Sequence, residues 1–215
     1  MIVTYIGHSC FSVEKDGYRI VFDPYEDGSV PGLTNVREEA NMVICSHEHF
    51  DHNARGNVQI VDGGECPFEI MQIETYHDGE KGASRGSNTI TVVDDGESKL
   101  AHFGDLGCDI GEDMDADDIE LLKNLDVILV PVGGTYTINP KEAAELIEML
   151  EPRIALPMHY RSNIFGFGFD NIAEENEFYD EAEAVAKLHD SVLDSEAKPF
   201  VRVNALRPRN MKPVK

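Results

Sequence analysis

The stretch SHEHFDHN, residues 46–53, brings three histidines and one aspartate together within six positions. It directly follows the apolar run Met42–Cys45, which has the pattern of a strand buried on both faces. Imidazole nitrogens and carboxylate oxygens are ligands that Zn²⁺ and similar divalent ions accept. Because only eight histidines occur in 215 residues, a chance cluster on a solvated loop explains this spacing poorly. The stretch therefore predicts a metal site at a strand end.

The length and composition indicate one folded domain. The chain has 215 residues, of which 41% are hydrophobic and 27% are charged, and no linker divides it. We therefore expect residues 1–215 to form a single domain with a substantial core. No apolar run approaches the roughly 20 residues of a membrane span, and the first residues are typical of a strand rather than a signal peptide. Four scattered cysteines without a C-x-x-C pair add to the expectation of a cytoplasmic protein.

The charge limits the classes of partner. The formal net charge is −23, from 41 acidic and 18 basic side chains. A surface this negative repels phosphate backbones and anionic lipids, which argues against nucleic acid and membranes as partners. A small-molecule substrate is the expected partner, and assembly into a homo-oligomer stays open.

The first half of the chain predicts β-hairpins. Asp16-Gly17 and Asp94-Asp95-Gly96 are turn sequences between β-forming segments, and Pro24 ends the strand before it because proline cannot continue the ladder. The predicted strands are Ile2–Ile6, Cys10–Val13, Arg19–Phe22, Met42–Cys45, Phe68–Glu74, Thr89–Val93 and Lys99–Phe103.

The second half alternates helices and strands. Asn139 as N-cap and Pro140 at the first helical position predict the start of one helix. The predicted helices are Ala116–Asn124, Pro140–Leu150 and Glu174–Asp190, and the predicted strands are Asp126–Val132, Arg153–Pro157 and Phe200–Val203. Both halves fit one α/β (α+β) domain in which two sheets pack together with helices outside.

Further side chains that can coordinate a metal ion follow other predicted strands. His77 comes after one strand, Asp105 after the second hairpin, and His159 after the strand that ends at Pro157. A single histidine at a strand end is about as often structural as functional, but the joint pattern is far less common by chance. If these strand ends share one edge of the sheets, their side chains converge with residues 46–53.

This series of motifs resembles the metallo-β-lactamase superfamily. The resemblance rests on H-x-H-x-D-H at residues 47–52, His77, Gly104-Asp105 and His159, and it extends from Gly7 to Tyr160. Four flanking pieces are similar to the branch of metal-dependent hydrolases that includes ascorbate-6-phosphate lactonase. They are GHSCF at 7–11, FDP at 22–24, PVGGTYT at 131–137 and PMHY at 157–160. The resemblance implies a four-layer αββα sandwich of two mixed sheets, with the metals at one edge.

The resemblance also implies a set of ligands for two divalent ions. His47, His49 and His77 would hold the first ion, and Asp105 would bridge to the second. The second ion would take Asp51, His52 and His159 as its remaining ligands. Seven ligands for two ions leave room for a bridging hydroxide, as in a catalytic site. Zn²⁺ is the first choice for this donor set, and Mn²⁺ or Fe is also accepted by carboxylate-bridged sites.

Other residues are predicted to support the ligands or to contact substrate. Asp51 is the catalytic candidate, because one oxygen can bind metal while the other orients the water. Asp23 would hydrogen-bond a ligand imidazole and fix its tautomer, although a turn-capping role is an alternative. His8, Tyr160 and Arg161 are the remaining candidates.

Two loops offer further contacts to substrate. Arg161, or Arg85 in the turn-rich loop 79–88, would favour an anionic substrate if it pointed inward. Phe165–Phe169 could form an aromatic lid, although core packing of at least one ring is the simpler expectation.

The predicted function is metal-dependent hydrolysis, with a metal-bridging hydroxide attacking a small ester, a lactone or a related carbonyl substrate. A small-molecule phosphodiesterase or a nuclease could use the same dinuclear site. A non-catalytic metal-binding regulatory protein is an alternative of another class.

Overall fold

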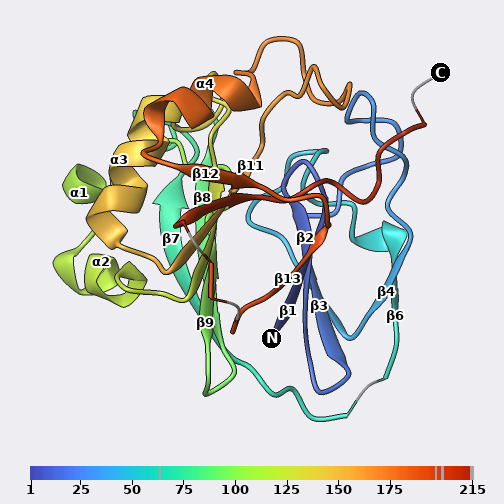
Figure 1. The fold of residues 1–215 in the computed structure, drawn as a ribbon. Helices are drawn as coiled ribbons and strands as arrows, with labels where there is room; N and C mark the ends of the chain where they lie inside the picture. The colour runs from blue at the N-terminus through green and yellow to red at the C-terminus, as the bar shows by residue number, and fades with distance from the viewer. Residues whose placement is uncertain (63, 197, 200, 214–215) are drawn as a thin grey trace.

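Two mixed β-sheets pack against each other and share one hydrophobic core (Figure 1). The computed structural model describes residues 1–62, 64–196, 198–199 and 201–213. No helix in these ranges is long and apolar enough to cross a membrane. The mixed α/β architecture with two packed sheets confirms the predicted fold class.

The N-terminal hairpins build the first sheet, whose strand order is β13-β1-β2-β3-β5. Its strands are β1 (Ile2–Gly7), β2 (Cys10–Lys15), β3 (Tyr18–Phe22), β5 (Met42–Ile44) and β13 (Val192–Asp194). Asp16 and Gly17 both have positive φ, at 52° and 81°, as the tight turn between β2 and β3 requires. Strands β3 and β5 are parallel, so Asp23 and residues 46–53 follow them at the same edge.

The second sheet has the strand order β12-β14-β11-β10-β9-β8-β7. Its strands are β7 (Glu69–Tyr76), β8 (Ser87–Asp94), β9 (Lys99–His102), β10 (Val127–Pro131), β11 (Ile154–Met158), β12 (Val185–Lys187) and β14 (Val203–Ala205). β9, β10 and β11 are parallel, and β7 runs in their direction because β8 is antiparallel to both β7 and β9. The carboxyl ends of these four strands therefore lie at one edge.

The helices gather on the outer face of the second sheet (Figure 1). They are α1 (Ile110–Asp113), α2 (Ala116–Leu122), α3 (Pro140–Leu150) and α4 (Glu175–Glu181). Asn139 caps α3 as predicted, in a capping box with Glu142. On the side of the first sheet lies the strand pair β4 (Glu38–Ala40) and β6 (Val58–Ile60), and a short 3-10 turn, η1 (Arg55–Asn57), leads directly into β6.

The prediction of a helix over Glu174–Asp190 is wrong beyond its first two turns. α4 ends at Glu181, and Val185–Lys187 forms β12, an edge strand parallel to β14. Pairing with β14 overrides the helical preference of this alanine- and glutamate-rich segment. The predicted strand Phe200–Val203 is replaced by β14, which starts at Val203, and Phe200 itself lies outside the described residues.

Candidate metal centre

Side chains that can coordinate a metal ion follow four strands at one edge of the sheets. His47, His49, Asp51 and His52 follow β5, and His77 follows β7. Asp105 follows β9, and His159 follows β11. All seven predicted ligands therefore leave their strands at this edge, and all but His49 have at most 8% of their surface exposed.

Asp105 lies at the middle of the cluster. Its Oδ2 is 3.2 Å from the Nε2 atoms of His52 and His159, 3.3 Å from Nε2 of His77 and 3.9 Å from Nε2 of His47. One carboxylate oxygen thus has four imidazole nitrogens around it. His49 joins through ring contacts, with its centroid 4.6 Å from that of His47 and 5.0 Å from that of His77.

Several polar atoms of the cluster are buried without a hydrogen-bond partner in the described residues. They are Nε2 of His47 and His52, both ring nitrogens of His159, and Oδ1 of Asp105. Unsatisfied buried polar atoms are rare in proteins because each costs free energy. Their lone pairs are the donors that a divalent ion takes, so the residues present fit a metal ion. Three groups among the described residues could hold a metal ion: His47 with His49 and His77, His8 with Asp51, His52 and His159, and Asp23 with His47 and His52.

Hydrogen bonds to Nδ1 orient three of these histidines. Nδ1 of His52 lies 2.7 Å from Oδ2 of Asp23, and Nδ1 of His77 lies 2.9 Å from the carbonyl oxygen of Tyr136. Both partners only accept, so Nδ1 carries the proton and Nε2 faces the cluster. Nδ1 of His47 is 2.9 Å from the Ser46 hydroxyl. Such contacts fix the tautomer and the ring orientation of a metal ligand.

Asp23 also holds the backbone before the histidine loop. Its two oxygens accept from the Ser46 amide at 2.7 Å and from the Ser46 hydroxyl at 2.6 Å. The Asp23 carboxylate is completely buried, and neighbouring imidazoles lower its pKa against the opposing effect of burial. Asp23 therefore contacts a candidate ligand, His52, and ties β3 to the loop after β5.

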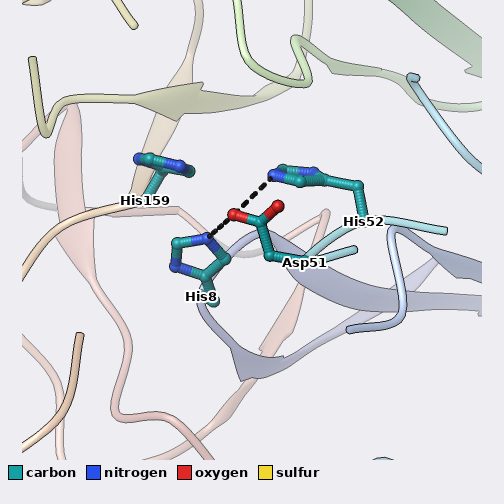
Figure 2. A group of neighbouring side chains, drawn as sticks. All are labelled: His8, Asp51, His52 and His159. Atoms are coloured by element: carbon teal, nitrogen blue, oxygen red, sulfur yellow. Dashed lines mark hydrogen bonds and ion pairs between the residues drawn. The ribbon is translucent and has the colours of Figure 1, made fainter. Parts of the chain in front are cut away.

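His8 joins the second group from the turn between β1 and β2. Figure 2 shows His8, Asp51, His52 and His159 pointing toward one another. Nε2 of His8 lies 3.2 Å from Oδ2 of Asp51, and its ring centroid lies 4.3 Å from that of His159. Burial lowers the pKa of His8 to about 4, so the ring is neutral at pH 7 and donates from Nε2 to the carboxylate.

The cluster is strongly coupled electrostatically. Burial lowers the pKa of His47 to about 3. Burial also acts to lower the pKa of His52, but the carboxylates of Asp105 and Asp23 outweigh it and raise that pKa well above its ordinary value. Burial acts to raise the pKa of Asp105, yet His159 and His52 lower it well below its ordinary range. The ionised carboxylates of Asp105 and Asp23, set among imidazole rings, are suited to a cation.

Three site residues have strained backbones. His8, Asp23 and His159 have φ of 57°, 44° and 54°, a region that only a small fraction of residues other than glycine adopt. Such strain is concentrated at functional sites because the surrounding structure must enforce it. At His159 the chain is also pressed against Gly133, where an added Cβ would lie 2.0 Å from the His159 carbonyl oxygen.

An aromatic pair lies beside the second group. Phe50 is 53% exposed, and its ring centroid is 6.4 Å from that of Phe169. Phe169 in turn contacts His8 edge-on at 5.3 Å. The run Phe165–Phe169 is predicted to form a lid or to pack in the core. Phe169 lies at the edge of the sheets that carries the candidate ligands, called the metal edge, whereas Phe167 is buried against Tyr160.

Two predicted substrate residues are not brought to the cluster. Tyr160 is buried in the core beside Tyr5, with 1% of its surface exposed. Arg161 is ion-paired with Glu174 at 3.0 Å. Sequence reasoning missed Ser46 and the Tyr136 carbonyl. Ser46 adjoins the histidines and could have been found, but the carbonyl carries no side-chain signal.

Comparisons with known proteins agree with this fold and site. The family model of the β-lactamase superfamily domain matches residues 2–159. A UPF0173 metal-dependent hydrolase from Methanopyrus kandleri is 31% identical over 198 residues, which cover 74% of this chain and 84% of the relative. The chain therefore belongs to the metallo-β-lactamase superfamily and, within it, to the UPF0173 family of metal-dependent hydrolases.

Two further relatives cover nearly the whole chain. A UPF0173 protein from Pyrococcus furiosus is 28% identical and covers 93% of this chain and 98% of its own length. A solved structure from Thermotoga maritima, a candidate zinc-dependent hydrolase of the superfamily, has a TM-score of 0.68 and 29% identity. The match covers 96% of this chain and 99% of that one. The chain is thus a metal-dependent hydrolase whose substrate must be inferred from its own residues.

Proposed function

We propose that this chain uses two divalent ions, with Zn²⁺ as the first choice, to hydrolyse a small ester, a lactone or a related carbonyl substrate. One observation carries the proposal: four imidazole nitrogens surround Oδ2 of Asp105, and most of them have no hydrogen-bond partner among the described residues. A cluster of this composition lacks a structural purpose in the metal-free chain, because its unsatisfied atoms destabilise the fold.

The proposed ligands divide into two groups around Asp105. His47, His49 and His77 would hold one ion, and Asp51, His52 and His159 would hold the other. Two of the three candidate groups, His47 with His49 and His77 and His8 with Asp51, His52 and His159, share no residue, which supports two ions rather than one. A divalent ion bound there would lower the pKa of a coordinated water toward neutral pH and would polarise a carbonyl oxygen.

The remaining chemistry comes from residues that hold protons and orient groups. Nδ1 of His52 donates to Asp23, and Nδ1 of His77 donates to the Tyr136 carbonyl. The Nε2 atom of each ring is therefore directed at the cluster. His8 donates to Oδ2 of Asp51 and leaves Oδ1 of Asp51 for an ion or for a water molecule. Phe169 contacts His8 edge-on and Phe50 contacts Phe169, which places apolar surface beside the second group.

A carbonyl substrate is favoured over a phosphodiester by charge. The chain carries a formal charge of −23, which disfavours polyanionic nucleic acid. The similarity of residues 131–137 and 157–160 to ascorbate-6-phosphate lactonase-like proteins supports a lactone or ester. A small phosphodiester remains the second candidate on the same site, and a non-catalytic metal-binding role is the third.

Metal analysis and a substrate panel test the proposal. We expect about two transition ions per chain in protein prepared without chelators, and hydrolysis of lactones or esters in preference to bis(4-nitrophenyl) phosphate. Asp51→Ala should abolish hydrolysis, while Asp180→Ala, an exposed aspartate on α4, should not change it. Fewer than one ion per chain, or full activity of Asp51→Ala, would overturn the dinuclear hydrolase.

A further inference from the structure

Two loops from opposite sides of the metal edge meet on Tyr136. The loop after β7 places the Arg85 guanidinium 5.4 Å from the centroid of the Tyr136 ring. The loop after β11 brings the Asn171 amide to 2.5 Å from the Tyr136 hydroxyl, to which it donates. The Tyr136 carbonyl accepts from Nδ1 of His77 at 2.9 Å. Tyr136 therefore couples both loops directly to a candidate metal ligand.

The loop that carries Arg85 is held in place by Asp78. Its two carboxylate oxygens accept four backbone N–H groups, from Glu80, Gly82, Ser84 and Arg85, at 2.6–3.0 Å. At the other end of the loop, the Gly86 carbonyl accepts from the His77 amide at 3.1 Å. The Arg85 backbone is thus fixed relative to His77, although its side chain is exposed.

Arg85 differs from the other cations around the metal edge. Arg55, Arg161 and Lys81 each lie within 3.3 Å of a carboxylate, and their partners are Glu48, Glu174 and Asp113. Arg85 has no such partner among the described residues, and its guanidinium contacts only the Tyr136 ring face. Although the chain has 41 acidic side chains, none among the described residues pairs with Arg85, so its guanidinium N–H groups are available to a ligand.

We propose that Arg85, held over Tyr136 and backed by the Tyr136 hydroxyl, binds a carboxylate or phosphoryl group of the substrate at the rim next to His77. The planar guanidinium presents paired donors that match either anion, and stacking on the ring orients it. This inference rests on the proposed hydrolysis and narrows its substrate to esters or lactones that carry an anionic group away from the bond that is cleaved.

Matched esters test this inference. The probes are 4-nitrophenyl pentanoate, mono-4-nitrophenyl glutarate and the 4-nitrophenyl ester of 4-phosphonobutyrate, which share the leaving group and differ at the acyl end. We expect the metal-loaded wild type to prefer an anionic ester, and the ratio of the two anionic esters to identify the anion. Arg85→Ala should lower kcat/KM for the preferred ester by about 5- to 15-fold, mainly through KM, and leave the pentanoate unchanged.

Arg55→Ala is the control, because it removes a nearby exposed cation that is already paired with Glu48. Equal losses in Arg55→Ala and Arg85→Ala, or an Arg85→Ala loss that includes the pentanoate, would overturn the subsite. Glutarate binding by calorimetry, with butyrate for comparison, separates this inference from the proposed function. If no ester is hydrolysed but Arg85→Ala weakens glutarate binding selectively, the carbonyl chemistry fails and the anion subsite stands. If glutarate binds wild type and Arg85→Ala equally, the subsite fails.

Discussion

Replacing His8 by alanine tests how the second half of the cluster is organised. The change removes the hydrogen bond, 3.2 Å long, that Nε2 of His8 donates to Oδ2 of Asp51, in a place where His8 is completely buried. A hydrogen bond to a buried charged group contributes about 1.5–3 kcal/mol, which corresponds to roughly 10–150-fold in a binding constant. Without it, Asp51 must be ordered when the ion binds, and we expect the affinity of the second ion to fall by that factor.

The assay is competition with a chromophoric chelator, which resolves two successive Zn²⁺ affinities. The weaker His8→Ala affinity should belong to one ion only, because His8 belongs to the group with Asp51, His52 and His159 and not to that of His47, His49 and His77. His8→Gln is the matched control. It meets the same backbone cost at φ 57° but keeps an N–H donor, so it should recover part of the loss. The reasoning would be refuted if His8→Ala bound both Zn²⁺ ions with wild-type affinity. It would also be refuted if both Zn²⁺ affinities fell equally and the metal-free variant melted at a lower temperature than the metal-free wild type.

Three further perturbations test other parts of the structure. Gly133→Ala places a Cβ 2.0 Å from the His159 carbonyl oxygen and should cost the second ion, so two ions per chain by metal analysis would contradict it. Chelation should lower the melting temperature by about 8–16 °C, since ligand at 1,000-fold its Kd contributes about 4.1 kcal/mol, and Zn²⁺ should restore it. Burial raises the pKa of Glu175, so its ionisation destabilises the fold as pH rises through that pKa. Glu175→Gln should therefore melt at a higher temperature than wild type near pH 8, and the difference should shrink toward pH 4; a gap that grows in acid would refute this.

The candidate ligands could be selected from the sequence because they follow predicted strands: residues 47–52 follow one strand, and His77, Asp105 and His159 each follow another. The apolar run before residues 46–53 and the hairpin before Asp105 locate the strand ends, and metal-grade side chains there have few other uses. The atoms that orient the ligands could not be predicted in the same way. The Tyr136 carbonyl lies 59 residues from His77, and any residue type at position 136 would supply it.

The ion pairing of Arg161 and Arg85 shows a second limit of prediction from the sequence. Arg161 and Arg85 are both arginines close to a predicted ligand, and the sequence does not distinguish them. A bridge between Arg161 and Glu174, residues that follow β11 and precede α4, places a carboxylate within 3.0 Å of one guanidinium. The carboxylate near the other, Asp78, is already occupied by four backbone N–H groups. Pairing across loops thus decides which cation stays available.

The distribution of unsatisfied atoms links the stability of this fold to its site. Among the described residues, nine buried side-chain nitrogens and oxygens have no hydrogen-bond partner, and six of them belong to His8, His47, His52, Asp105 and His159. Each such atom costs about 1–3 kcal/mol, which is large beside the roughly 5–15 kcal/mol that holds a domain folded. Most of the unpaired buried polar atoms, and three residues with strained backbones, therefore lie together at the edge that carries the candidate ligands. The unfavourable free energy is concentrated there. Bound ions remove most of this cost at once, so the metal-loaded protein should unfold as one cooperative unit, whereas the metal-free protein should first loosen at the ends of β5, β7, β9 and β11. Hydrogen exchange with and without Zn²⁺ would show this as protection gained mainly in residues that follow those four strands, and uniform protection along the chain would contradict it.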